Sequence, residues 1–378
     1  MSDRPSPPEP ARFLAVIAAV VAALAFPGSP APAATSPAPS RSELSLRQLA
    51  GQRVIFSYHG LTPPATLMRT IRAGEAAGVI LFAENIAGRA QIREVISDLQ
   101  RAAAQSAVKA PLLVMTDQEG GPVRRLPGAP APSARQIGAV ARPVSAAREA
   151  GRGAGRNLRG VGMNVNLAPV LDVYRKPGNF IDAFGRSYSG RPRTVAALGA
   201  AFIRAQQRSG VAATAKHFPG LGAATRTQNT DLRPVTLRLP LRSLRGVDEL
   251  PYRSAIAAGA RLVMVSWARY PALDRRRPAG LSSAAVQGEL RRRLGFAGVT
   301  VTDALEAGAL RGFGPVSDRA VLAARAGMDL VLCSARSARQ GRSAVGALEA
   351  ALRRGRLPET AFMASVERVT ALRSVLAG

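Results

Sequence analysis

The sequence predicts an α/β protein of the (β/α)8 TIM-type barrel class, and three features of the chain support this. Eight short apolar runs recur along it, several of them continuous rather than alternating, as parallel strands buried on both faces require. Amphipathic segments with helical spacing separate these runs. Polar and charged side chains gather directly after the runs, at the strand ends where a barrel of this class carries its functional groups.

The predicted strands are short, and the predicted helices between them are longer. The strands lie at residues 53–58, 78–84, 112–118, 163–173, 211–217, 262–267, 299–303 and 328–333. Helical spacing is evident at 90–108, 194–209 and 282–294, and further helices are expected after Arg339. This alternation indicates a closed barrel in one domain. An open doubly wound sheet is the alternative, but no glycine-rich dinucleotide-binding motif follows any of the runs.

The N-terminus has the features of a secretory signal. Arg4 and Arg12 precede an apolar run at 13–26, and a small-residue A-x-A pattern follows at 31–33. This run is too short to cross a bilayer comfortably, so a cleaved signal is favoured over a retained anchor. We therefore predict a signal peptide at 1–33, a Ser/Pro linker at 34–42 and the barrel at 43–378. The protein is then expected to be bacterial, secreted or associated with the cell envelope, with no stable membrane insertion after cleavage.

The chain is strongly basic, with 52 Lys and Arg against 24 Asp and Glu and a net charge of +28. Nearly all of this charge is Arg, which shares GC-rich codons with the abundant Ala, Gly and Pro, so genomic composition accounts for it. Only 4% of residues are aromatic and no nucleic-acid-binding motif is present, so no nucleic-acid partner is expected. The charge is compatible with electrostatic association with an anionic cell envelope. Two isolated histidines suggest no metal site, and no cofactor is expected.

The polar residues at the strand ends are the candidate functional site. The third predicted strand ends at Asp117, the fifth at Lys216 and His217, and the seventh at Asp303. The loop after the fourth strand adds Arg186. Since the C-terminal ends of barrel strands meet at one rim, these side chains are expected to converge, which indicates an enzyme that acts on a polar ligand.

Five segments carry a resemblance to a known family. They are D-Q-E-G-G-P-V-R-R at 117–125, N-L-A-P-V-L-D-V at 166–173, F-G-R-S-Y at 184–188, A-K-H-F-P-G-L-G at 215–222 and V-T-D-A-L-E-A-G-A at 301–309. Together they resemble glycoside hydrolase family 3, and in particular its single-barrel β-N-acetylhexosaminidase branch. The resemblance implies a retaining β-glycosidase whose partner is a carbohydrate, an N-acetylglucosamine-containing glycan of the cell wall (peptidoglycan) or one derived from chitin.

The resemblance also implies roles for six residues. Asp303 matches the family's nucleophile, and a carboxylate suits that task because it can attack an oxocarbenium-like centre and form a covalent glycosyl-enzyme. The positions that hold the non-reducing sugar are Asp117, Arg125, Arg186, Lys216 and His217. Other readings remain open at this stage: Asp303 as a helix cap, Lys216 in a structural ion pair, His217 as a core histidine and Arg125 as a surface residue. Asp172 and Glu119 are expected to support the site rather than to contact the sugar.

The chain departs from the branch where the general acid/base is expected. After K-H-F-P-G the branch carries a histidine, and then an Asp-x-His pair whose histidine transfers the proton. The corresponding residues here are Leu221, Thr227 and Asn229, and none of them titrates near neutral pH. The sixth strand also ends in Trp267, where a histidine is common in the branch.

Loss of a positioned acid costs roughly 10²–10⁴-fold in rate. Besides a fully active glycosidase, two alternatives remain open. Asp231, Glu306 and His59 are candidate substitutes for the missing proton donor. The first alternative is a catalytically weak or inactive sugar-binding relative of the family. The second is an unrelated barrel enzyme that uses Lys216 as a Schiff-base amine, although this leaves the other motifs unexplained.

Overall fold

The computed structural model describes residues 44–376 and, before them, only Met1. The predicted signal peptide and linker, Met1 aside, therefore lie outside the described residues.

Eight parallel strands form a closed barrel, as predicted. They are β1 (Val54–Phe56), β2 (Gly78–Ile80), β3 (Leu113–Thr116), β6 (Val165–Asn166), β7 (Ala212–Phe218), β8 (Leu262–Val265), β9 (Val299–Ala304) and β10 (Leu330–Leu332). Around the barrel the order is β1, β10, β9, β8, β7, β6, β3 and β2, and β2 pairs with β1 to close the ring. Each strand falls on the apolar run predicted for it, and the closure rules out the open doubly wound sheet.

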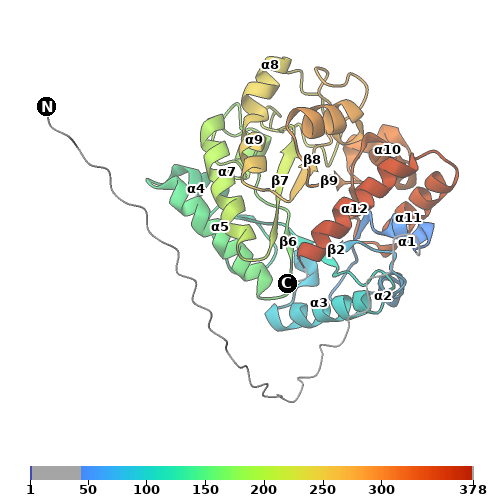
Figure 1. The fold of residues 1–378 in the computed structure, drawn as a ribbon. Coiled ribbons are helices and arrows are strands. Elements are labelled where there is room, and N and C mark those ends of the chain that lie inside the picture. The colour runs from blue at the N-terminus through green and yellow to red at the C-terminus, as the bar shows by residue number, and fades with distance from the viewer. Residues whose placement is uncertain (2–43, 377–378) are drawn as a thin grey trace. The chain divides into compact units, whose positions relative to one another are not determined.

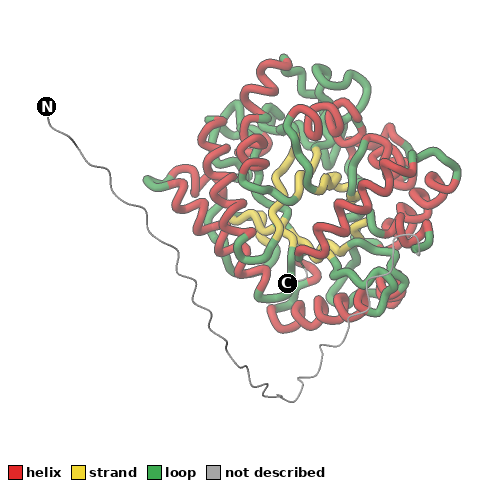
Figure 2. The backbone as a smooth tube through the Cα atoms, in the orientation of Figure 1, coloured by secondary structure: helices red, strands yellow, loops and turns green. Residues whose placement is uncertain are grey.

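Helices surround the strands, so that the yellow strands of Figure 2 lie inside a ring of red helices. The colours of Figure 1 follow these helices along the chain. The α-helices of at least six residues are α1 (Leu46–Gly51), α2 (Ala65–Arg72), α3 (Arg89–Ala104), α4 (Ala134–Ala139), α5 (Pro143–Arg159), α7 (Pro192–Gln207), α9 (Leu250–Ala257), α10 (Val316–Ala326), α11 (Ala338–Arg353) and α12 (Glu359–Val375). Shorter ones are α6 (Phe180–Ala183) and α8 (Leu241–Ser243). The predicted helix at 282–294 is the π-helix η5 (Ala284–Arg293). A second π-helix, η3 (Leu244–Asp248), lies earlier in the chain.

Most of the predicted strands were longer than the strands observed, and two of them differ for a clear local reason. The run at 163–173 forms only the two-residue β6, followed by a single parallel bridge between Val170 and Lys216. Pro169 interrupts the run because proline has no N–H to donate to the neighbouring strand. The run at 78–84 leaves the sheet after Ile80 and turns into the 3-10 helix η2 (Ala83–Asn85).

The core has an inner and an outer layer, because strand side chains alternate between the two faces of the sheet. Ile55, Met115, Leu262 and Val301 belong to the inner cluster, which fills the barrel. Their sequence neighbours, such as Val54 and Val263, pack outward against the helices in a second cluster. Burial on both faces is the reason that these strands read as continuous apolar runs.

The last helix closes the end of the barrel at which the strands begin. Val369 and Leu372 of α12, and Leu376 after it, belong to the same cluster as the barrel interior. The helix crosses the strands in Figure 1. Arg373 anchors it, because its guanidinium donates to the carbonyls of Pro111 (2.8 Å) and Ala110 (2.7 Å).

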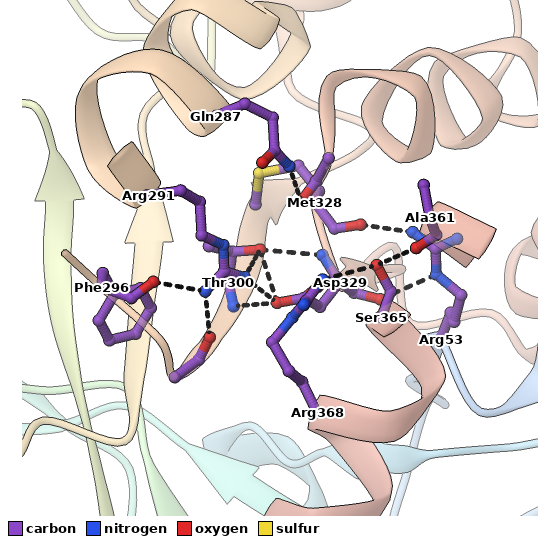
Figure 3. A network of polar contacts seen from close by, with 12 residues as sticks. Arg53, Gln287, Arg291, Phe296, Thr300, Met328, Asp329, Ala361, Ser365 and Arg368 are labelled. Atoms are coloured by element: carbon purple, nitrogen blue, oxygen red, sulfur yellow. Dashed lines mark hydrogen bonds and ion pairs between the residues drawn. The ribbon is translucent and has the colours of Figure 1, made fainter. Parts of the chain in front are cut away.

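A buried polar network stabilises the same end (Figure 3). Asp329, which precedes β10 and is fully buried, accepts hydrogen bonds from the backbone N–H of Thr300 (2.8 Å) and from its hydroxyl (3.0 Å). Arg291 of η5 and Arg368 of α12 both form ion pairs with its carboxylate. Arg53, just before β1, donates to the carbonyl of Asp329 and lies 4.4 Å above the ring centre of Phe362. One carboxylate thus joins two strands to two helices.

The other end of the barrel carries the loops in which the sequence motifs lie. After β3 the chain forms a small antiparallel hairpin of β4 (Gln118–Gly120) and β5 (Val123–Arg124). After β8 and β9 come the 3-10 helices η4 (Ala279–Leu281) and η6 (Gly308–Phe313). Among the helices within 44–376, none is long and apolar enough to cross a membrane.

Candidate active site

A cavity of about 350 Å³ opens at the C-terminal ends of the strands. All six predicted site residues line it: Asp117, Arg125, Arg186, Lys216, His217 and Asp303. The apolar part of the lining includes Phe82, Phe180 and Met264. The structure therefore brings the predicted residues together as the barrel rule requires, and the roles that the resemblance gave them stay predictions.

Four charged side chains form a connected cluster on one wall. Nζ of Lys216 lies 2.7 Å from Oδ1 of Asp117 and 2.7 Å from Oε1 of Glu119. Arg186 holds Glu119 with two parallel hydrogen bonds, from Nε at 2.9 Å and from Nη2 at 2.8 Å. Such charge-assisted, bidentate contacts fix geometry as well as energy. The cluster positions Asp117, Arg186 and Lys216 at the cavity surface.

The cluster keeps its members ionised despite their burial. Burial favours the neutral form of Glu119, but Arg186 and Lys216 outweigh it and hold its pKa far below the ordinary value. Burial likewise favours a neutral Lys216, but Asp117 and then Glu119 outweigh it, so the pKa of Lys216 is raised. A Schiff-base lysine needs a lowered pKa to be nucleophilic, and this lysine has the opposite. The ion pairs of Lys216 and its raised pKa therefore argue against the Schiff-base alternative.

Arg125 completes this wall from the hairpin. Its backbone N–H donates to the carbonyl of Asp117 (3.2 Å), which ties the hairpin end to the strand end. Its buried Nε has no hydrogen-bond partner among the residues that the structure describes. A buried guanidinium N–H without an acceptor is costly. Arg125 nevertheless lines the cavity, so it is not only a surface residue.

His217 lies next to Lys216 at the end of β7 and is oriented by Asp172. Nδ1 of the imidazole is 2.8 Å from Oδ2 of Asp172, and the backbone N–H of His217 donates to Oδ1 (3.3 Å). Oδ1 also accepts from the N–H of Leu221 at 2.6 Å. Asp172 is fully buried and does not line the cavity, so it positions the histidine and the following turn, as expected. His217 is consequently a cavity residue and not only a core histidine.

Leu221 lines the cavity where the branch carries its first histidine. Gly222 follows it and lies against the backbone of Val173, so closely that a Cβ would overlap the Val173 carbonyl. The turn between β7 and the next loop is therefore packed directly on the segment after β6. This packing fixes where the loop at 223–231 begins.

Asp303 lies near the end of β9 and is partly accessible from the cavity. Its Oδ1 accepts from the N–H of Ala304 (2.8 Å), and the carbonyl of Ala304 accepts from Nε1 of Trp267 (2.8 Å). The next helical element, η6, begins at Gly308 with Ala307 at its N-cap position. Asp303 is thus not a helix cap. Trp267, buried behind it, holds the strand end in place.

The expected proton-donor positions do not supply a donor. Thr227 is exposed, Asn229 is half-buried, and neither lines the cavity. Of the three candidate substitutes, His59 is 80% exposed, pairs with Glu84 at 3.2 Å and lies outside the lining. Asp231 and Glu306 both line the cavity.

The carboxyl group of Asp231 differs from an ordinary surface aspartate. The residue is exposed, and it lines the cavity. Desolvation of its carboxyl group, and then the nearby negative charge of Asp303, raise its pKa to about 6, although His217 and Arg186 act in the opposite direction. Such a value suits a group that must both give and take a proton near neutral pH.

Two polar cavity residues after the eighth strand were not found by the sequence reasoning. Ser334 and Arg336 follow β10 and line the cavity. Arg336 lies 4.6 Å above the ring centre of Phe82 and 3.1 Å from Glu84. The rule that polar residues after a barrel strand face the site, used above for the third to the seventh strands, identifies both residues when it is applied to the eighth.

Comparison with known sequences shows the family. A sequence profile described as "Glycosyl hydrolase family 3 N terminal domain" matches residues 44–372. The chain belongs to glycoside hydrolase family 3. It is therefore a glycoside hydrolase with a carbohydrate substrate, and the resemblance in its five motifs is confirmed.

Three similar proteins, one found by sequence and two among solved structures, each match most of this chain. An "uncharacterized secreted glycosyl hydrolase" from Arthroderma benhamiae is 48% identical over 335 residues, which cover 88% of this chain and 94% of that protein. A β-N-acetylglucosaminidase of this family from a Paenibacillus species superposes with a TM-score of 0.83 at 39% identity, over 89% of this chain but 64% of that enzyme. A β-N-acetylhexosaminidase from Beutenbergia cavernae superposes with a TM-score of 0.80 at 32% identity, over 88% of this chain and 100% of that one.

Proposed function

We propose that the chain is a secreted, retaining β-N-acetylhexosaminidase that acts on N-acetylglucosamine-containing glycans. The observation that carries the proposal is the cavity, which Asp303 lines together with Asp117, Arg186 and Lys216 of the charged cluster. The two similar enzymes with solved structures support the sugar, since one is named a β-N-acetylglucosaminidase and the other a β-N-acetylhexosaminidase. The name of the Arthroderma relative supports secretion, as does the predicted signal at 1–33.

The proposed reaction has two displacement steps. A carboxylate oxygen of Asp303 attacks the anomeric carbon, the bond from that carbon to the leaving oxygen breaks, and the leaving oxygen takes up a proton. Water then attacks the anomeric carbon from the opposite face and loses a proton, and the carboxylate of Asp303 departs. Two inversions give net retention at the anomeric carbon.

The wall cluster would hold the non-reducing sugar during both steps. Asp117 would accept hydrogen bonds from sugar hydroxyls, since one of its oxygens is taken by Lys216 and the other is available. Arg125, Arg186, Lys216 and His217 would donate to sugar oxygens. Because Glu119 fixes two of these donors, little ordering would be required when the sugar binds.

The test is cleavage of an aryl N-acetyl-β-glucosaminide by the wild type and by Asp303→Asn. Removal of the nucleophile is expected to lower kcat/KM by at least about 10⁴-fold, because the covalent route is lost. Incubation with a slowly hydrolysed fluoro-glycoside, followed by peptide mapping, is expected to label the peptide that contains Asp303. A label on another peptide would overturn the assignment of the nucleophile.

A second candidate function is supported by Thr227 and Asn229, which replace the proton-donating pair of the branch. The chain would then bind the sugar without turning it over. This reading predicts that wild type and Asp303→Asn are equally inert on the aryl glycoside while both bind N-acetylglucosamine in calorimetry. Turnover by the wild type alone contradicts it.

A further inference from the structure

A retaining glycosidase needs a group that protonates the leaving oxygen, and none occupies the expected positions here. We propose that Asp231 is the general acid/base of this enzyme. The inference rests on the proposed function, because it names the second catalytic group of the same reaction. It assigns this role to a carboxylate two residues beyond the position where the branch has its histidine.

The position of Asp231 is fixed relative to the nucleophile. The carbonyl of Asp231 accepts from the N–H of Gly308 (2.7 Å), and the carbonyl of Thr230 accepts from the N–H of Ala309 (2.9 Å). Gly308 and Ala309 begin η6, a few residues after Asp303 on the same segment. The end of the 223–231 loop is therefore attached to the segment that carries the nucleophile. Both carboxylates line the one cavity, as a two-carboxylate glycosidase requires.

The side chain of Asp231 is free to act. Its backbone N–H donates to Oδ1 of Asn229 (2.8 Å), so Asn229 shapes the loop at the residue where the branch has its acid. Within 44–376, no hydrogen bond or ion pair of this structure engages the Asp231 carboxylate. Asp303 and Asp231 are nevertheless close enough for the charge of one to act on the other.

Each of the other carboxylate and histidine side chains in the cavity already has at least one hydrogen-bond or ion-pair partner. Oε1 of Glu306 accepts from the hydroxyl of Ser334 (2.6 Å), and its Oε2 accepts from Nε2 of Gln340 (2.9 Å) and from the N–H of Ser334 (3.3 Å). Nδ1 of His217 contacts Asp172, and the residue lies next to the Lys216 cluster. Glu306 thus joins the ends of β9 and β10, whereas Asp231 has no such structural task.

The proposed steps balance without a further reactant. In the first, the Asp231 carboxylic acid gives its proton to the leaving oxygen. At the same time a carboxylate oxygen of Asp303 forms a bond to the anomeric carbon, and the bond from that carbon to the leaving oxygen breaks. In the second, the Asp231 carboxylate takes a proton from the attacking water while the Asp303 carboxylate departs. Both groups return to their starting protonation states.

The decisive experiment compares two substrates in Asp231→Asn. The first, chitobiose, has a leaving group that needs protonation, and the second, dinitrophenyl N-acetyl-β-glucosaminide, has one that does not. We expect kcat/KM for chitobiose to fall by about 10²–10⁴-fold and kcat/KM for the dinitrophenyl substrate to stay within about tenfold of wild type. Equal losses on both substrates, or no loss on chitobiose, would overturn the proposal.

Azide provides an independent readout that a merely structural role would not produce. Azide needs no general base, so in Asp231→Asn it attacks the glycosyl-enzyme, displaces the Asp303 carboxylate and gives the β-glycosyl azide. We expect azide to raise kcat for the dinitrophenyl substrate and the β-azide to appear by NMR. Formation of this product in Glu306→Gln but not in Asp231→Asn would transfer the role to Glu306 and overturn the inference.

The pH profile gives a third readout. Burial, and then the charges of Asp303 in β9 and Glu306 after it, raise the pKa of Asp231, while His217 of β7 and Arg186 lower it, and the result is a value of about 6. The acid must be protonated to act, so kcat/KM for chitobiose is expected to fall about tenfold per pH unit above about 6. This fall should be absent in Asp231→Asn, and its persistence there would count against the role.

These outcomes separate the inference from the proposed function. Asp303→Asn is expected to lose both substrates and to give no β-azide. If the wild type cleaves neither substrate, the glycosidase proposal itself fails. If the wild type cleaves both and Asp231→Asn matches it on both, only the role of Asp231 fails.

Discussion

Glu119 determines how the charges of the cavity are arranged, although it does not line the cavity. It pairs with Arg186 through both carboxylate oxygens and with Lys216 through one of them. With Asp117 included, two carboxylates face two cations, so this cluster of four side chains is electrically balanced. Glu119 therefore positions the side chains that would contact the sugar, but does not itself reach the cavity.

Replacement of Glu119 by Gln tests this arrangement. The variant leaves Lys216 and Arg186 with one anionic partner fewer, and breaking a buried pair costs about 3–5 kcal/mol. We expect the free energy of unfolding in urea to fall by about that amount, and the affinity for N-acetylglucosamine to fall as well because two donors lose their support. An affinity that is unchanged would show that Asp117 alone positions Lys216.

The same variant should show a defined pH dependence. The pKa of Glu119 in the folded protein is depressed below its ordinary value of 4.5, so the stabilisation is present above about pH 4.5 and is lost as the pH falls toward the folded pKa. The difference in unfolding free energy between wild type and Glu119→Gln is therefore expected to shrink as the pH is lowered below about 4.5. A difference that is constant between pH 7 and pH 3 would contradict an ionic origin.

At the scale of elements, the strands could be predicted and the loops between them could not. Each barrel strand can be recognised from its own residues, because a strand buried on both faces is a continuous apolar run. The loop at 223–231 carries no such local signal. Its end is placed by hydrogen bonds from Gly308 and Ala309, which lie about 80 residues further along the chain, and such long-range contacts leave no spacing pattern to read. This is why Asp231 was one of three equal candidates in the sequence.

Gly308 provides the test at this scale, because its lack of a side chain lets the two segments meet. A Cβ at Gly308 would overlap the carbonyl of Leu232 and lie 2.9 Å from that of Asp231. Gly308→Ala is therefore expected to push the 223–231 loop away and to displace Asp231. A displacement of about 1 Å can cost roughly 10²-fold in rate, so kcat/KM for chitobiose should fall by about that factor.

Gly312→Ala is the matched control for this substitution. It lies in the same 3-10 helix, and no atom lies within 4 Å of the position that its Cβ would take. We expect it to leave kcat/KM for chitobiose and for the dinitrophenyl substrate near wild type. Equal effects of the two alanines would mean that η6 as a whole, and not the contact with the loop, is responsible.

At the scale of the whole molecule, the two ends of the barrel have different tasks. The C-terminal ends of the strands carry the cavity, and the N-terminal ends carry α12 and the Asp329 network. The six predicted site residues were accessible to sequence reasoning because each lies within one of the five motifs. The ion pairs of Glu119 were not, since they depend on how loops from distant strands meet. The barrel topology alone supplies that information.

The separation of the two ends predicts that stability and activity can be changed independently. Asp329 is fully buried and is shared by Arg291, Arg368 and Thr300. Asp329→Asn removes the charge that both arginines face, so the free energy of unfolding is expected to fall by about 3–5 kcal/mol. Because the network lies where the strands begin, kcat/KM of the folded variant on the dinitrophenyl substrate should match wild type.

Asp98→Asn is the control for this prediction, and urea unfolding together with initial rates at 25 °C is the measurement. Asp98 forms an exposed ion pair with Arg101 within α3, and such pairs contribute about 0–1 kcal/mol. We therefore expect its unfolding midpoint to stay close to wild type while that of Asp329→Asn falls clearly. A loss of kcat/KM in Asp329→Asn under conditions where it is fully folded would show that the two ends are coupled. The cavity residues would then depend on α12 as well as on their own strands.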